Sequence, residues 1–144
     1  MSTVGSAAAV EPPRRGRPAS LRLASGLHLL LGAGFGAGAA VVLDQFAKHG
    51  ELPMSPFGWR YMAGPFEDLG PPAFTALGWS LVAVCAVDAI AGLWLWQGRR
   101  GGLRLSLATA VPAFALAIGF ELPFLLVGVP IRTALALRAR HSLT

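Results

Sequence analysis

Apolar residues dominate four segments of this chain, and short polar stretches separate them. The segments are residues 21–43, 72–97, 103–120 and 123–140. A helix needs about 20 apolar residues to cross a hydrocarbon core roughly 30 Å thick, and these segments approach or exceed that length. The pattern therefore predicts an all-α integral membrane protein, in which a four-helix transmembrane bundle forms a single transmembrane domain over residues 21–140.

The number of spans depends on residues 103–140, an apolar stretch that prolines and charges interrupt. Its two halves would each be about 27 Å long at a rise of 1.5 Å per residue. Pro123 suits the first turn of a helix, and Glu121 just before it suits a helix entrance at the membrane surface. Two crossings are therefore predicted here; the alternative is three transmembrane helices plus a C-terminal interfacial helix.

The basic residues give the orientation. They gather in the N-terminal tail, in the turn at 98–102 and near the C-terminus, which the positive-inside rule assigns to the cytoplasm. With only three spans, Arg132, Arg138 and Arg140 would all lie outside. The charges thus favour four spans, a multi-pass protein of the cell membrane with both termini cytoplasmic, and an outward-facing loop at 44–71.

The N-terminal segment, residues 1–20, is rich in Ala, Pro, Gly, Ser and Arg. Such a composition cannot bury enough apolar surface to fold, so it predicts a disordered basic tail. A basic tail before an apolar run also fits a cleaved signal peptide. Because the run at 21–43 exceeds the roughly 7 to 15 apolar residues of a signal sequence, an uncleaved first span is favoured.

Composition supports the membrane interpretation. Of the 144 residues, 54% are hydrophobic and only 13% are charged, whereas a soluble domain has about 25% charged residues. The net charge of +5 does not predict a nucleic-acid partner, because the basic residues flank apolar runs instead of clustering with stacking aromatics. The richness in Ala, Gly and Arg resembles that of proteins from high-GC bacteria.

Four glycines alternate within the first predicted span: Gly32, Gly34, Gly36 and Gly38. Small residues four positions apart lie on one helix face and let two helix backbones approach closely in lipid. The partner is either another helix of the same chain or a second copy of the protein.

The loop at 44–71 is rich in aromatic and charged residues, with Trp59, Arg60 and Tyr61 at its centre. Amphipathic rings favour the headgroup zone of a membrane. An interfacial loop or short helix follows from this composition, and a lid over a lipid or quinone pocket is the functional alternative. No other cofactor is predicted.

Polar residues inside the predicted spans are the candidate site. His28, Asp88 and Arg132 all lie about 9 to 14 Å from the cytoplasmic ends of their helices, and Thr109 can join them. Charges inside a bilayer are costly, so a buried Asp88–Arg132 ion pair is expected. One interpretation is an interhelical lock; the other is a proton or ion path, or a headgroup site, because histidine titrates near physiological pH.

Prolines within the spans add acceptors nearby. Pro112 and Pro130 cannot donate hydrogen bonds, which frees the carbonyls of Ala108 and Leu126. Cys85 is the one cysteine and is predicted to be a small apolar filler. The sequence contains no catalytic constellation, no phosphate-binding loop and no metal-ligand pair at helical spacing.

Residues 86–105, AVDAIAGLWLWQGRRGGLRL, resemble the second-to-third-helix region of the DoxX-like membrane proteins. In both, an acidic residue precedes a Gly- and Leu-rich helix end and a basic glycine turn, and the first span with Lys48 after it is loosely similar. The resemblance implies a four-helix bundle, and some members act in quinone-linked sulfur oxidation or oxidative-stress complexes. Asp88 stands where the family more often has Glu, and the loop at 44–71 has no counterpart.

These observations predict a structural or accessory subunit of a membrane complex, whose partners are the lipid bilayer and other membrane subunits or further copies. The alternative is a small transporter or proton-conducting homo-oligomer. A membrane redox subunit is the third possibility.

Overall fold

The computed structural model describes residues 18–143, and nearly all of them outside the loop at 50–64 are helical. The prediction of an all-α protein is therefore confirmed, whereas most of the predicted tail at 1–20 lies outside the described residues. The helices are α1 (Ala19–Leu29), the π-helical η1 (Leu30–Phe35), α2 (Gly36–His49), the 3-10 helix η2 (Pro65–Leu69), α3 (Pro71–Trp96), α4 (Arg100–Gly119), α5 (Pro123–Arg138) and the 3-10 helix η3 (Ala139–Ser142).

The first helix is longer than the apolar pattern predicted. α1, η1 and α2 form one continuous helix of 31 residues that ends at His49, not at residue 43. Lys48 Nζ lies 2.7 Å from Asp44 Oδ2, an (i, i+4) ion pair that supports the last turn. Gly50, with φ of 73°, then closes the helix in the left-handed conformation, and its N–H bonds to Phe46 O.

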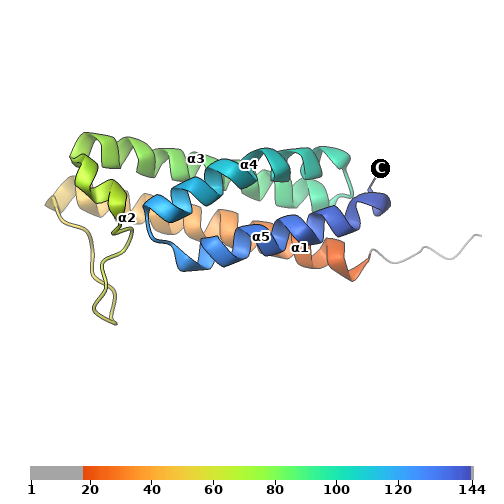
Figure 1. Ribbon diagram of the computed structural model, residues 1–144, viewed down its shortest axis with the longest axis horizontal. Helices are drawn as coiled ribbons and strands as arrows, with labels where there is room; N and C mark the ends of the chain where they lie inside the picture. The colour runs from red at the N-terminus through yellow and green to blue at the C-terminus, as the bar shows by residue number, and fades with distance from the viewer. Residues whose placement is uncertain (1–17, 144) are drawn as a thin grey trace, which may run out of the picture.

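Glycine and proline set the other helix boundaries. Gly70 has φ of 87°, and two prolines in the first turn of α3 follow it. Gly98 has φ of 79° in the turn between α3 and α4, which run antiparallel (Figure 1). Glu121 takes a positive φ of 46° in the reversal from α4 to α5, so the predicted turn at Glu121 and Pro123 is present.

Three of the helices are long and apolar enough to cross a membrane: the continuous helix Ala19–His49, α3 and α4. α5 has 16 residues and is shorter.

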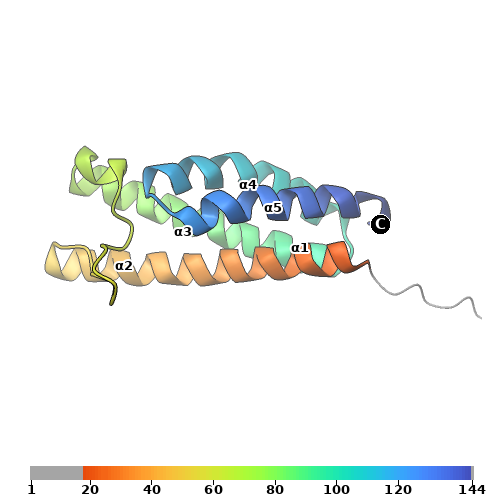
Figure 2. The ribbon, with the colours of Figure 1, turned by 60° about the horizontal axis from the view of Figure 1, so that its bottom comes forward.

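The helices pack side by side along one long axis, so that the bundle has two distinct ends (Figure 2). At one end, here called the basic end, lie the start of α1, the α3–α4 turn and the end of α5. Arg100 Nε donates a hydrogen bond to Leu143 O there, at 3.2 Å. At the other, the hairpin end, lie the end of α2, the loop at 50–64 and the α4–α5 turn (Figure 1).

The core is apolar at both ends of the bundle. At the hairpin end the rings of Phe46, Phe66, Phe74 and Phe120 pack in edge-on and tilted pairs, with centroids 5.1 to 5.5 Å apart. At the basic end Leu21, Ala24, Leu95, Ala136, Ala139 and Leu143 form a smaller cluster. Buried polar residues lie between the two.

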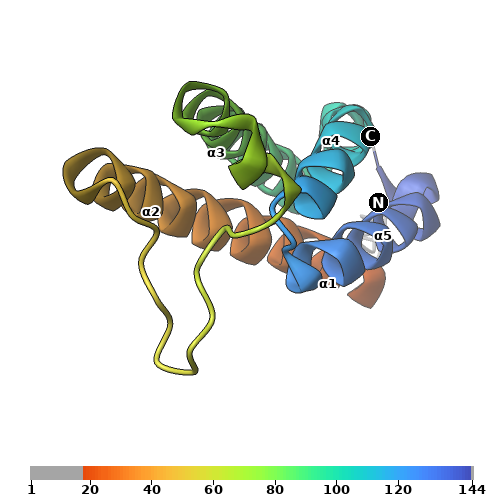
Figure 3. The same ribbon diagram turned by 60° about the vertical axis from the view of Figure 1, so that its left-hand side comes forward.

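The loop at 50–64 folds as a narrow hairpin that projects sideways from the bundle (Figure 3). Met54 and Arg60 face each other in an antiparallel bridge. Ser55 N donates to Trp59 O at 2.7 Å, and Tyr61 N donates to Pro53 O at 3.0 Å. The loop expected at the interface is thus a hairpin followed by the short helix η2.

Candidate functional site

The polar residues singled out in the sequence meet inside the bundle, and each comes from a different helix. His28 lies on α1, Asp88 on α3, Thr109 on α4 and Arg132 on α5. Their exposed fractions are 0%, 3%, 5% and 1%, respectively. We call these four residues, together with Ser106, the polar cluster.

Asp88 is the centre of the polar cluster. Its Oδ2 forms an ion pair with Nη1 of Arg132. Its Oδ1 accepts a hydrogen bond of 2.9 Å from Thr109 Oγ1 and lies 4.0 Å from His28 Nε2. The carboxylate therefore links α3 directly to α4 and α5, and indirectly to α1.

The hydrogen bonds of His28 indicate its tautomer. Nδ1 lies 2.8 Å from the carbonyl of Ala24, which can only accept, so Nδ1 carries a proton. In the neutral ring Nε2 is then an acceptor, and Ser106 Oγ, 2.7 Å away, donates to it. A doubly protonated ring would instead present an N–H between Ser106 and Asp88.

Ser106 was not identified in the sequence. It is fully buried on α4, three residues before Thr109, and so lies on the same helix face. That spacing was the available signal. A single serine in an apolar helix is inconspicuous, however, because its hydroxyl can bond to its own backbone.

The proline-freed carbonyls do not take the role expected of them. Within residues 18–143, no side chain of the polar cluster bonds to Ala108 O or Leu126 O. Thr109 Oγ1 instead lies 3.0 Å from Leu105 O, one turn back in its own helix. Arg132 Nε has no hydrogen-bond acceptor in the described part of the chain.

Close helix contact brings α1 and α3 together at the level of the cluster. A Cβ placed on Gly92 of α3 would lie 2.8 Å from the Cβ of His28 and 3.1 Å from the backbone nitrogen of Leu29. Only glycine allows this approach, and the approach carries the imidazole toward Asp88 and Ser106.

The alternating glycines divide into two pairs. A Cβ on Gly32 would lie 2.7 Å from both the Ala89 nitrogen and the Cys85 oxygen, and one on Gly36 would lie 3.0 Å from Cys85 Cβ. This pair packs against α3 of the same chain. Cβ atoms on Gly34 and Gly38 would meet nothing within 4 Å, so the second pair faces outward.

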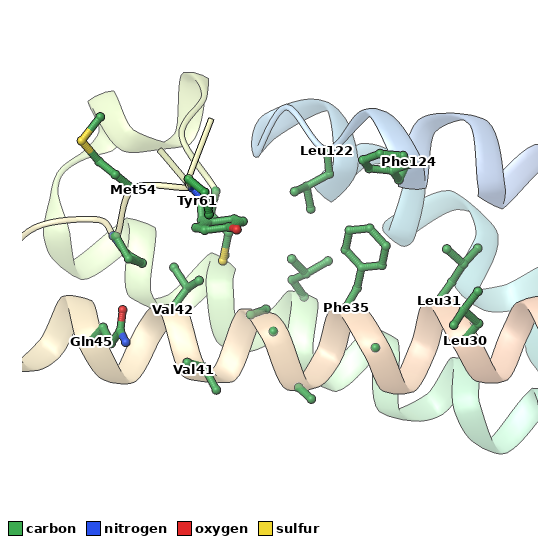
Figure 4. A pocket seen from close by; sticks show the side chains of 18 residues that line it. Leu30, Leu31, Phe35, Val41, Val42, Gln45, Met54, Tyr61, Leu122 and Phe124 are labelled. Carbon is green, nitrogen blue, oxygen red and sulfur yellow. The ribbon is translucent and has the colours of Figure 1, made fainter. Parts of the chain in front are cut away.

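An apolar groove of about 950 Å³ lies along this outward face. Its wall is the continuous helix from Leu30 to Gln45, and Tyr61 and Phe124 approach from the hairpin and from α5 (Figure 4). A second, shallower cavity of about 630 Å³ lies between α4 and α5. No residue of the polar cluster lines either cavity.

The predicted interfacial residues lie on the hairpin, with Trp59 58% and Tyr61 44% exposed. The ring of Trp59 contacts that of Phe57 at 5.5 Å. Arg60 makes a bidentate contact with Glu67 of η2, at 2.6 and 3.0 Å. Of Trp59, Arg60 and Tyr61, only Tyr61 lines the groove.

Residues 18–143 offer few groups for thiol or metal chemistry. Cys85 is buried in the apolar core of the hairpin end, where it fills space. Over residues 18–143 no group of three or more His, Cys, Asp or Glu side chains could hold a metal ion.

No protein-family model matches the chain, and no curated protein or solved structure does either. The resemblance to DoxX-like proteins, and the redox role that it would imply, therefore remain predictions.

Proposed function

We propose that the protein is a multi-pass membrane protein that serves as a structural or accessory subunit of a membrane complex. The observation that carries this proposal is the burial of the polar cluster: its members are at most 5% exposed, and neither cavity reaches them. A transporter or enzyme needs access from substrate to its polar groups. A closed cluster instead holds helices together, as buried polar contacts do in membrane bundles.

The proposal includes a fourth crossing by α5. At 1.5 Å per residue α5 is about 24 Å long, less than a core of roughly 30 Å. Arg138 and Arg140 at its end can extend toward the headgroups, and local thinning of the bilayer can absorb the difference. The burial of Arg132 on α5 against α3 supports the same arrangement.

In the proposed orientation the basic end faces the cytoplasm. Arg99 and Arg100 lie at this end where α3 turns into α4, and Arg138 at the end of α5 and Arg140 on η3 lie there too. The positive-inside rule then assigns both termini to the cytoplasm and the hairpin to the opposite surface.

A proton-conducting homo-oligomer is the second candidate. It is favoured by the 4.0 Å contact between His28 and Asp88, since a histidine beside a carboxylate is the material of proton relays. Against it, Asp44 and Glu121 lie toward the hairpin end, too far along the helices for direct transfer.

One experiment separates the two candidates. The purified protein is reconstituted into liposomes and proton flux is measured; an accessory subunit gives no flux above that of empty liposomes, and it migrates with a larger assembly after extraction in mild detergent. A defined homo-oligomer whose flux disappears in Asp88→Asn, while the variant stays folded, would establish conduction instead.

A further inference from the structure

The groove beside the continuous helix, about 950 Å³ in volume, is a feature that the polar cluster leaves unexplained. Gly34 and Gly38 of the continuous helix line it, and Leu81 of α3 lines it as well. Leu122 and Phe124 bound it on the side of the α4–α5 turn (Figure 4). It is open sideways, where lipid would contact a membrane-embedded bundle.

The hairpin covers one end of this groove. Pro53, Met54 and Tyr61 line the same cavity as Val42 and Gln45, and Figure 4 shows the ring of Tyr61 over Val42. The hairpin is held in this place from both ends.

Two buried side chains anchor the hairpin. Leu52 and Met62, 6% and 5% exposed, belong to the apolar core of the hairpin end. Ser55 Oγ accepts hydrogen bonds from the backbone nitrogens of Phe57 and Trp59, at 3.3 and 3.2 Å. The cover is therefore part of the fold.

We propose that this groove binds one acyl chain of a membrane phospholipid. The inference rests on the proposed insertion of the bundle into a membrane. The groove runs from Leu30 to Gln45, about 22 Å at the helical rise. One leaflet is half of a core of roughly 30 Å thick, so a single chain entering beneath the hairpin fits inside it.

The hairpin argues against a transmembrane helix as the occupant. A partner helix packed on Gly34 and Gly38 would have to continue across the whole bilayer, and at the hairpin end it would meet Met54 and Tyr61. A lipid chain ends within the membrane and needs no such passage. Its apolar length also suits a groove lined almost wholly by aliphatic and aromatic side chains.

The charges near the groove indicate that a phospholipid is recognised through its acyl chain and not through its headgroup. Lys48 is paired with Asp44, and Arg60 is paired with Glu67, so both cations already have anionic partners within the chain. The Gln45 amide and the Tyr61 hydroxyl are the polar groups that line the groove. Both can hydrogen-bond to the ester region of a lipid of any headgroup charge.

The test uses the full-length protein in vesicles of phosphatidylcholine that carries a photoreactive diazirine in the middle of one acyl chain. After irradiation, peptide mapping measures adducts on residues 30–42 and 53–62. We expect these segments to be labelled several-fold more than the exposed residues Ile90 and Leu93 of α3, which do not line the groove. Replacing phosphatidylcholine with labelled phosphatidylglycerol leaves the yield unchanged.

Filling the groove supplies the matched comparison. Gly38→Leu and, separately, Ala37→Phe place side chains into the open space and should lower labelling of residues 30–42 several-fold. Gly26→Leu adds the same bulk on the same helix at another open position outside the groove, and should leave the labelling unchanged.

Three results would overturn the proposal. One is equal labelling of the groove and of Ile90 and Leu93; another is undiminished labelling in folded Gly38→Leu and Ala37→Phe. The third is quantitative disulfide dimerisation of Gly34→Cys in a Cys85→Ala background, because a second copy would then occupy the groove. If α3 itself takes no label, membrane insertion fails as well.

Discussion

At the residue scale, Asp88 and Arg132 depend on each other. Both are almost fully buried, and removing a charge from water costs several kcal/mol unless a partner compensates it. Thr109 and the nearby imidazole of His28 complete the surroundings of the carboxylate. We therefore expect the ion pair to matter for stability mainly because either charge, buried without its partner, would strongly destabilise the bundle.

We therefore expect single replacements in this pair to be worse than the double replacement. Asp88→Leu or Arg132→Met leaves one buried, unpaired charge and should lower the free energy of unfolding by about 3 to 5 kcal/mol. The double variant should recover much of that loss, because no charge remains. Unfolding titrations in mixed micelles measure the cycle, and additive single effects would contradict the ion pair.

The contact between Ser106 and His28 makes a smaller, separable prediction. Ser106→Ala removes the donor to Nε2 and should cost on the order of 0.6 kcal/mol, the average for polar contacts in membrane bundles. Ser80→Ala is the matched control, since this exposed serine donates to Ala76 O of its own helix and makes no other side-chain hydrogen bond within residues 18–143. Equal thermal midpoints for the two variants would show that the buried contact contributes nothing.

Depth along the helices was enough to find most of the cluster from the sequence. His28, Asp88 and Arg132 stand out because ionisable residues are rare inside apolar helices, and counting from the helix ends gave them a common level. Ser106 escaped because a serine carries no such signal. Whether the carbonyls of Ala108 and Leu126 accept hydrogen bonds from the polar cluster could not be predicted, because the sequence does not show which way each helix face points.

At the element scale, the continuous helix and α3 pack with their backbones in close contact. Gly32 sits in the π-helical segment, where the widened turn lies directly against the backbone of Ala89 and Cys85. The apolar pattern predicted a span here but not this widening, because periodicity reports which residues are apolar and not how closely two backbones approach. The extension of the first helix to His49 was missed because the last turn of this helix is polar and does not continue the apolar pattern.

Gly32→Ala and Gly34→Ala form a matched test of this contact. A methyl group on Gly32 would lie 2.7 Å from backbone atoms that cannot turn aside, so we expect a loss of about 1 to 3 kcal/mol in stability. Gly34 has open space, and alanine there should gain up to about 1 kcal/mol through its helix propensity. Unfolding titrations measure both variants; similar effects at the two positions would contradict the assigned helix face.

At the scale of the whole molecule, the arrangement of the two ends links topology to the polar cluster. Asp88 and Arg132 can pair only if α3 and α5 reach the same depth, and α5 does so by turning back at Glu121 and Pro123. An α5 lying flat on the membrane surface would separate the two charges. If α5 does not turn back across the membrane, Asp88 and Arg132 cannot form their ion pair, so a test of the topology is also a test of the ion pair.

This link makes the side of the C-terminus the most informative prediction for the molecule. A fluorescent-protein fusion after Thr144 should be fluorescent and so cytoplasmic, whereas alkaline phosphatase inserted at Gly58, the exposed tip of the hairpin, should be active on the opposite side. Phosphatase inserted at Gly101, in the first turn of α4 at the basic end, is the control and should be inactive. An extracytoplasmic C-terminus with the other two reporters unchanged would exclude α5 as a span and would require Arg132 to leave Asp88.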